Sequence, residues 1–132
     1  MTVALYLDTS ALVKLVVAES ETAALRAWLQ DQGSELVACD LARTELMRTI
    51  RRVASDRIMQ ARAVLDTVTL LGATAAVFEA AGRLDPPALR SLDAIHLASA
   101  LDVGDDLDGL VTYDDRLVAA ARSNGVTVVT PR

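Results

Sequence analysis

Short apolar runs alternate along the chain with longer segments in which apolar residues recur every three or four positions. The short runs predict strands and the longer segments predict helices. The predicted strands cover residues 3–7, 35–39, 68–71, 107–112 and 126–129. Because a helical pattern separates each strand from the next, the order predicts βα units around a mostly parallel sheet of four to five strands.

The helical patterns cover residues 10–18, 40–53, 74–84, 91–100 and 114–122, with two further helices beginning near Ser20 and Ser55. Asp40 and Ser91 are suited to cap the helices that follow them, because their side chains can accept hydrogen bonds from free backbone N–H groups. The predicted fold class is α/β, with helices on both faces of a central sheet. At this length we expect residues 1–132 to form a single domain.

Composition adds limits on the core and on location. Apolar residues make up 52% of the chain and aromatic residues only 3%, so we expect an aliphatic core. Cys39 is the only cysteine, which excludes an internal disulfide and favours a reducing compartment. No apolar stretch reaches the ~20 residues that span a bilayer. With no basic leader at the N-terminus, the expected location is the cytoplasm, without a membrane partner.

Four carboxylates occupy positions that parallel strands and their helices would bring to one edge. Asp8 follows the first predicted strand, and Asp114 lies just beyond the fourth. Glu45 lies in the first turns of the helix after the second strand, and Asp93 opens the helix that precedes the fourth. Ligands of open α/β sheets bind outside the carboxyl ends of the strands. We therefore expect the four acids to converge on one cleft.

Each acid also has a purely structural interpretation. Asp8, Asp93 and Asp114 can each stabilise the N-terminus of a helix, and Glu45 can pair with Arg48 or face water. Taken together these interpretations weaken, because Asp8 and Asp114 follow strands that should be buried. A carboxylate in such a place is costly unless it is paired or bound to a metal.

Clustered carboxylates predict a site for a hard divalent cation, Mg²⁺ or Mn²⁺, which prefers oxygen ligands. Asp8, Glu45, Asp93 and Asp114 are the candidate metal ligands and catalytic residues. One or two such ions can activate a water and stabilise the displacement of a phosphoryl group without a histidine or a nucleophilic side chain. The hydroxyls of Thr9, Ser10 and Thr112 are candidates to hydrogen-bond the carboxylates.

The net charge of −5 argues at first against a nucleic-acid partner. Most of that charge belongs to the four carboxylates if they form a metal site. Between residues 43 and 62 the charge is instead strongly positive, with arginines at positions 43, 48, 51, 52, 57 and 62. This segment is either a solvent-exposed helix face or a surface that binds phosphates.

The single histidine, His96, lies three residues after Asp93 on a predicted helix. Its apolar neighbours favour a packed, hydrogen-bonded core residue, although the spacing also allows it to face the same way as Asp93. Cys39 ends a predicted strand and is interpreted as a small apolar filler.

Four segments of the chain carry a family resemblance. They are LDTSALVK at residues 7–14, RTE at 43–45, LDAIHLA at 92–98 and VTYD at 111–114. These segments resemble the four acidic motifs of PIN-domain ribonucleases. In length and motif order the chain is most similar to the VapC-type toxins of type II toxin–antitoxin systems.

The resemblance implies a three-layer PIN-like fold and Mg²⁺- or Mn²⁺-dependent cleavage of RNA. It places Asp8, Glu45, Asp93 and Asp114 at the family's metal-binding and catalytic positions, with Asp115 leaving open which of the neighbouring pair faces the site. It also implies a homodimer and inhibition by a cognate VapB-type antitoxin that covers the acidic cleft. Arginines 48, 51 and 52 would then contact RNA phosphates or acids of the antitoxin.

Two other functions stay open at this point. A non-catalytic module could use the same fold to bind RNA or a protein partner, and a phosphohydrolase could act on a small phosphate ester. The target RNA, the number of ions and the choice between Mg²⁺ and Mn²⁺ are not predicted by the sequence.

Overall fold

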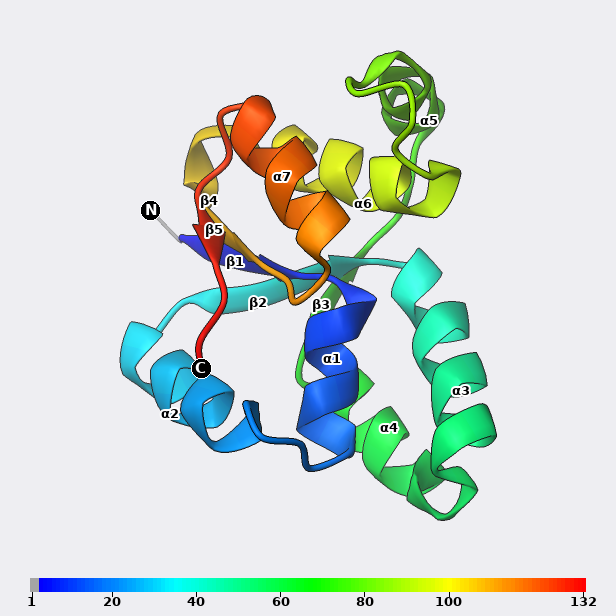
Figure 1. The fold of residues 1–132 in the computed structure, drawn as a ribbon, viewed down its shortest axis with the longest axis vertical. Coiled ribbons are helices and arrows are strands. Elements are labelled where there is room, and N and C mark those ends of the chain that lie inside the picture. Colours follow the sequence, from blue (N-terminus) through cyan, green and yellow to red (C-terminus); the bar gives the residue numbers. More distant parts are fainter. Residues whose placement is uncertain (1–2) are drawn as a thin grey trace.

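A computed structural model describes residues 3–132 and contains a five-stranded sheet in the order β3-β2-β1-β4-β5 (Figure 1). The strands are β1 (Ala4–Leu7), β2 (Glu35–Cys39), β3 (Thr69–Leu71), β4 (Leu107–Val111) and β5 (Val128–Val129). All four pairings between neighbouring strands are parallel. The predicted α/β class and the parallel sheet are confirmed.

Helices cover both faces of the sheet and produce three layers (Figure 1). One face carries α1 (Thr9–Val16), α2 (Thr22–Gln32), α3 (Leu41–Val53) and α4 (Ile58–Asp66). The other face carries α5 (Ala75–Arg83), α6 (Ser91–Asp102) and α7 (Asp115–Ser123). Within residues 3–132, none of the helices has the length and apolar character needed to cross a membrane.

The central strand β1 is buried on both faces, as expected for a parallel strand between two helical layers. Leu5 and Leu7 pack into the core formed with α1, α3 and α4, whereas Ala4 and Tyr6 pack into the core formed with α6 and α7. This alternation follows from the two-residue period of a strand. The end of β1 is therefore fixed from both sides, and so is the residue that follows it.

The chain reverses its direction of travel across the sheet at β1. From β1 it proceeds outward through β2 to β3, and it then returns to place β4 and β5 on the other side of β1. In open α/β sheets the ligand-binding crevice lies at such a switch point, at the carboxyl ends of the strands. Leu7 pairs with Val111 there, and the backbone N–H of Asp8 donates to Val111 O at 3.3 Å.

Two predicted helix caps are wrong. Asp40 precedes α3 but has helical backbone angles, φ −51° and ψ −26°, and its side chain makes no capping hydrogen bond. It instead accepts a hydrogen bond from Arg43 Nε at 2.9 Å. Ser91 is already the first residue of α6, and the extended residue at the cap position is Arg90.

Several predicted boundaries are also too generous. The first helix ends at Val16 rather than residue 18, and the last strand contains only Val128 and Val129. The helices expected to begin near Ser20 and Ser55 begin at Thr22 and, after a short 3₁₀ turn, at Ile58. The ends of helices and strands depend on the backbone hydrogen bonds of their terminal residues, and the spacing of apolar residues does not predict those bonds.

Replacing Leu12 by alanine tests whether packing fixes α1 on the sheet. Leu12 is fully buried, so the substitution should lower the free energy of unfolding by about 2–5 kcal/mol. Met59 is 81% exposed, and Met59→Ala should change it by less than about 0.5 kcal/mol. Urea denaturation of both variants measures the difference, and equal effects would contradict the proposed packing.

Candidate active site

Asp8 is buried at the carboxyl end of β1, with only 4% of its surface exposed. It caps α1: its Oδ1 accepts hydrogen bonds from the backbone N–H of Ala11 at 3.1 Å and from Ser10 Oγ at 2.6 Å. Its Oδ2 accepts one from Thr112 Oγ1 at 2.7 Å. Burial raises the pKa of Asp8, and these hydrogen bonds offset the rise only in part.

Asp114 caps a helix with one carboxylate oxygen and keeps the other outside the cap. Its Oδ1 accepts from the backbone N–H groups of Arg116 at 2.9 Å and Leu117 at 3.3 Å, at the N-terminus of α7. Its Oδ2 lies 3.7 Å from Arg90 Nη2. Asp115 is exposed in the first turn of α7, so Asp114 is the member of the pair that faces the other acids.

Asp93 lies in the first turn of α6, close to Asp114. Its Oδ2 is buried, accepts no hydrogen bond from residues 3–132 and lies 3.4 Å from Arg90 Nε. Burial raises the pKa of Asp93, the negative charge of Asp114 raises it further, and Arg90 opposes both effects. A single guanidinium thus lies between two carboxylates that would otherwise repel each other.

Glu45 projects from α3 toward α1 and α6. Its Oε1 accepts hydrogen bonds from Thr9 Oγ1 at 2.7 Å and from His96 Nε2 at 2.5 Å. Burial acts to raise the pKa of Glu45, but the hydrogen bond and charge interaction with His96 and the hydrogen bond from Thr9 outweigh it, so the pKa is lowered. Glu45 therefore pairs with His96 rather than with Arg48, and it is ionised near neutral pH.

The structure brings the four predicted acids to the same edge of the sheet, in linked positions. Glu45 and Asp93 line one hollow of about 570 Å³ together with Arg52 and Arg90. Asp8 and Asp114 do not line this hollow, but they share the hydroxyl of Thr112, which donates to Asp8 and accepts from the backbone N–H of Asp114 at 3.1 Å. As the sequence predicted, the hydroxyls of Thr9, Ser10 and Thr112 hold the carboxylates.

The arrangement of these oxygens limits how a metal ion could bind. In the described part of the chain, no three side chains of the His, Cys, Asp and Glu types are arranged to enclose a metal ion. Mg²⁺ usually needs only one or two carboxylates, because waters and substrate phosphates complete its coordination. Asp93 Oδ2, which is buried without a hydrogen-bond partner among residues 3–132, and Asp114 Oδ2, which lies near the same guanidinium of Arg90, are suited to that kind of site.

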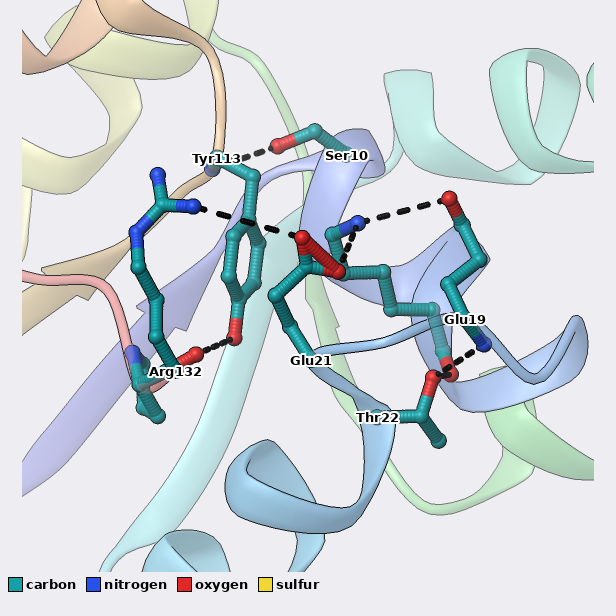
Figure 2. A network of polar contacts seen from close by, with 8 residues as sticks. Ser10, Glu19, Glu21, Thr22, Tyr113 and Arg132 are labelled. Atoms are coloured by element: carbon teal, nitrogen blue, oxygen red, sulfur yellow. Dashed lines mark hydrogen bonds and ion pairs between the residues drawn. The ribbon is translucent and has the colours of Figure 1, made fainter.

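A second polar network surrounds Ser10, whose hydroxyl donates to Asp8 (Figure 2). The backbone N–H of Tyr113 donates to Ser10 Oγ at 2.9 Å, and the Tyr113 hydroxyl donates to Pro131 O at 2.7 Å. Lys14 Nζ lies 4.8 Å from the centre of the Tyr113 ring and 3.1 Å from Glu21 Oε2. The network ties the C-terminal residues and the α1–α2 connection to the serine that holds Asp8.

Sequence reasoning missed one participant, Arg90, and favoured a purely structural role for another, His96. Arg90 was not a candidate, although its spacing of three residues before Asp93 is the only signal the chain offers. His96 was expected to be a packed, hydrogen-bonded residue, and this is confirmed by its 2% exposure. Its bond to Glu45 shows that it also faces the site, the second arrangement that the spacing allowed.

A family model, the PIN domain, matches residues 5–123 and so spans all four acids. The chain belongs to the PIN-domain family. This PIN domain is 41% identical to Ribonuclease VapC47 of Mycobacterium tuberculosis, with 96% of each chain covered. It is 44% identical to Ribonuclease VapC46 of the same species, covering 97% of this chain and 98% of the relative. The resemblance to VapC ribonucleases is confirmed.

Solved structures show the same fold at lower identity. This PIN domain matches VapC20 of M. tuberculosis, described as a Sarcin-Ricin loop cleaving toxin, with a TM-score of 0.78 and 18% identity. That match covers 96% of this chain and 99% of VapC20. A toxin–antitoxin complex from Klebsiella pneumoniae matches with a TM-score of 0.74 and 23% identity, covering 98% of each chain.

Replacing Asp8 by asparagine should make the protein more stable at neutral pH. The pKa of this carboxyl group is higher in the folded protein than in the unfolded chain, so the group favours folding at pH values at which it is protonated. This contribution is lost as the pH rises through the pKa of the folded state. Asparagine is neutral, and the hydroxyl partners can reverse their hydrogen bonds to suit its amide. We expect a gain of about 1 kcal/mol at pH 7, shrinking toward pH 4.

Urea denaturation of the metal-free protein at both pH values measures this gain. Asp66→Asn is the matched control, because Asp66 is exposed on α4 and should show little change. A variant that is no more stable than the wild type at pH 7 would show that burying the Asp8 carboxylate carries no cost.

Proposed function

We propose that this PIN domain is a VapC-type toxin that acts as a metal-dependent endoribonuclease. The observation that carries the proposal is Asp8: it is buried at the switch point of the sheet with no ion-pair partner among residues 3–132. Such a carboxylate weakens the fold unless it serves a ligand. The relatives named as VapC ribonucleases support RNA as the substrate class.

The proposed roles follow from the carboxylates that the fold gathers at this edge of the sheet. Asp8, Asp93 and Asp114 would hold Mg²⁺ or Mn²⁺, and a bound ion supplies the positive charge that polarises a phosphodiester and lowers the pKa of water. Glu45 is ionised and keeps Oε1 fixed by two donors, so its Oε2 can accept the proton of the attacking water. Ser10 and Thr112 keep Asp8 in place throughout.

Arg90 would exchange partners when the cation arrives. Its guanidinium lies 3.4 Å from Asp93 and 3.7 Å from Asp114, so it neutralises the two acids in the metal-free protein. Its side chain is 64% exposed, and such exposed ion pairs hold a side chain weakly. If Asp93 and Asp114 held a cation, Arg90 would be free to contact a phosphate of the substrate.

The arginines of α3 would extend the substrate path away from the acids. Arg48, Arg51 and Arg52 are exposed and line a hollow of about 320 Å³. Arg52 also lines the hollow that contains Glu45 and Asp93, so this residue borders both hollows. A single RNA strand bound along α3 would bring its phosphates from the arginines to the acids.

The proposed partners are a VapB-type antitoxin and a second copy of this chain. Structures of similar fold include the K. pneumoniae toxin–antitoxin complex and VapBC2 of Rickettsia felis, described as bound to a fragment of promoter DNA. The antitoxin would inhibit by covering the hollow of Glu45 and Asp93. Leu92, an exposed apolar residue that lines this hollow, would be covered with it.

The purified protein should cleave RNA in the presence of Mg²⁺ or Mn²⁺, and EDTA should abolish cleavage. Asp8→Asn and Asp93→Asn should each lower the cleavage rate at least about 100-fold, because each removes a negatively charged metal ligand. Gel electrophoresis of an end-labelled RNA measures the rate, and Asp66→Asn is the control that should cleave normally.

The two other functions give different outcomes in the same assay. RNA binding that is independent of metal, without cleavage, would favour a non-catalytic module. Hydrolysis of a small phosphomonoester in place of RNA would favour a phosphohydrolase. Cleavage by Asp8→Asn at the wild-type rate would place the chemistry outside this site.

Arg52→Gln should weaken RNA binding and reduce its dependence on salt. Each phosphate contact that is lost changes the slope of log K against log[salt] by about 0.7 for a single strand. Binding measured by fluorescence anisotropy in the Asp8→Asn background separates affinity from cleavage. Arg122→Gln, on the opposite layer, should leave the slope unchanged, and an unchanged slope in Arg52→Gln would exclude that contact.

A further inference from the structure

The short segment between β4 and α7, residues 112–114, connects the supports of two acids. Thr112 Oγ1 donates to Asp8 Oδ2 at 2.7 Å and accepts from the backbone N–H of Asp114 at 3.1 Å. The backbone N–H of Tyr113 donates to Ser10 Oγ at 2.9 Å, and Ser10 Oγ donates to Asp8 Oδ1 at 2.6 Å. A shift of Tyr113 would therefore disturb the surroundings of both carboxylates at once.

The side chain of Tyr113 is held by the ammonium group of Lys14. Lys14 Nζ lies 4.8 Å from the centre of the Tyr113 ring, and the Lys14 side chain is only 11% exposed. The face of an aromatic ring attracts a cation, and the attraction grows when the cation is removed from water. Because Lys14 belongs to α1, this contact fixes α1 against residues 112–114.

Two carboxylates keep the ammonium group in this place (Figure 2). Lys14 Nζ lies 3.1 Å from Glu21 Oε2 and 3.5 Å from Glu19 Oε2. The hydroxyl of Thr22 accepts from the backbone N–H of Glu19 at 2.9 Å and donates to Lys14 O at 2.8 Å. A buried charge is costly without such partners, so the ammonium group stays paired and in contact with the ring.

A second cation contacts the same ring more weakly. The guanidinium carbon of Arg132 lies 6.0 Å from the ring centre, and the Arg132 side chain is 63% exposed. Figure 2 shows the ring between the side chains of Arg132 and Glu21. Since a cation–π contact of an exposed group contributes less than one of a desolvated group, Lys14 rather than Arg132 fixes the ring.

We propose that Lys14, acting through the ring of Tyr113, is a positioning residue for the carboxylates of Asp8 and Asp114. The proposal rests on the proposed function, in which both carboxylates hold the cation. Within residues 3–132, Lys14 forms no ion pair with either of them. Its effect on the site therefore passes through Tyr113 and the hydrogen bonds of residues 112–114.

Lys14→Met removes the charge and keeps an unbranched side chain. It should raise the dissociation constant for Mn²⁺ about 10-fold, within the range typical of residues that orient metal ligands. Electron paramagnetic resonance measures the free ion without RNA, under conditions in which circular dichroism shows the variant to be fully folded. Arg132→Gln is the matched control, because it removes the exposed cation from the same ring and should change the affinity little. A wild-type affinity in Lys14→Met would overturn the proposal.

Tyr113→Leu tests whether the ring transmits the effect. Alone it should also raise the Mn²⁺ dissociation constant about 10-fold. Combined with Lys14→Met it should cause no further rise, because the ammonium group then has no ring to act on. Independent effects would multiply to about 100-fold and would overturn the proposal. A protein that binds Mn²⁺ and shows this coupling, but cleaves no RNA, would support the role of Lys14 and refute only the proposed function.

Discussion

The burial of one carboxylate, Asp8, is the constraint around which the site is built. It lies at the end of the most buried strand, where both helical layers meet, and no positive side chain in the described structure compensates its charge. Three hydrogen-bond donors stabilise this buried carboxylate: the backbone N–H of Ala11 at the N-terminus of α1 and the hydroxyls of Ser10 and Thr112. Those donors belong to elements more than one hundred residues apart, so the site can form only when β1 and β4 are paired.

The other acids are arranged around this point by different means. Asp114 is fixed by the helix that it caps, Asp93 is compensated by Arg90, and Glu45 is held by the donors Thr9 and His96. The pKa values move in opposite directions as a result: burial raises that of Asp93, whereas hydrogen bonds lower that of Glu45. Groups with such different proton affinities can take different parts in one reaction.

Much of the fold could be predicted from the sequence because the strands of a buried parallel sheet are continuous apolar runs. The positions of Asp8 and Asp114 follow from the same pattern, since both come directly after such runs. The contacts of Glu45 and Arg90 could not be predicted, because they depend on how α3 and α6 rotate about their axes when they pack. The cap expected at Asp40 failed for a related reason: its backbone is already helical, and its side chain is taken by Arg43.

The helix α3 carries an acidic site residue at its start and exposed arginines at its end. Its first turns contribute Glu45, whose carboxylate is anchored by donors from α1 and α6, and its last turns carry the exposed arginines. The buried residues Ala42, Leu46 and Ile50 hold the whole helix on the core. Substitutions on the exposed face of its C-terminal half therefore leave the acidic end in place. The residues that meet a ligand at this end of α3 can therefore change without moving the carboxylate at the other end.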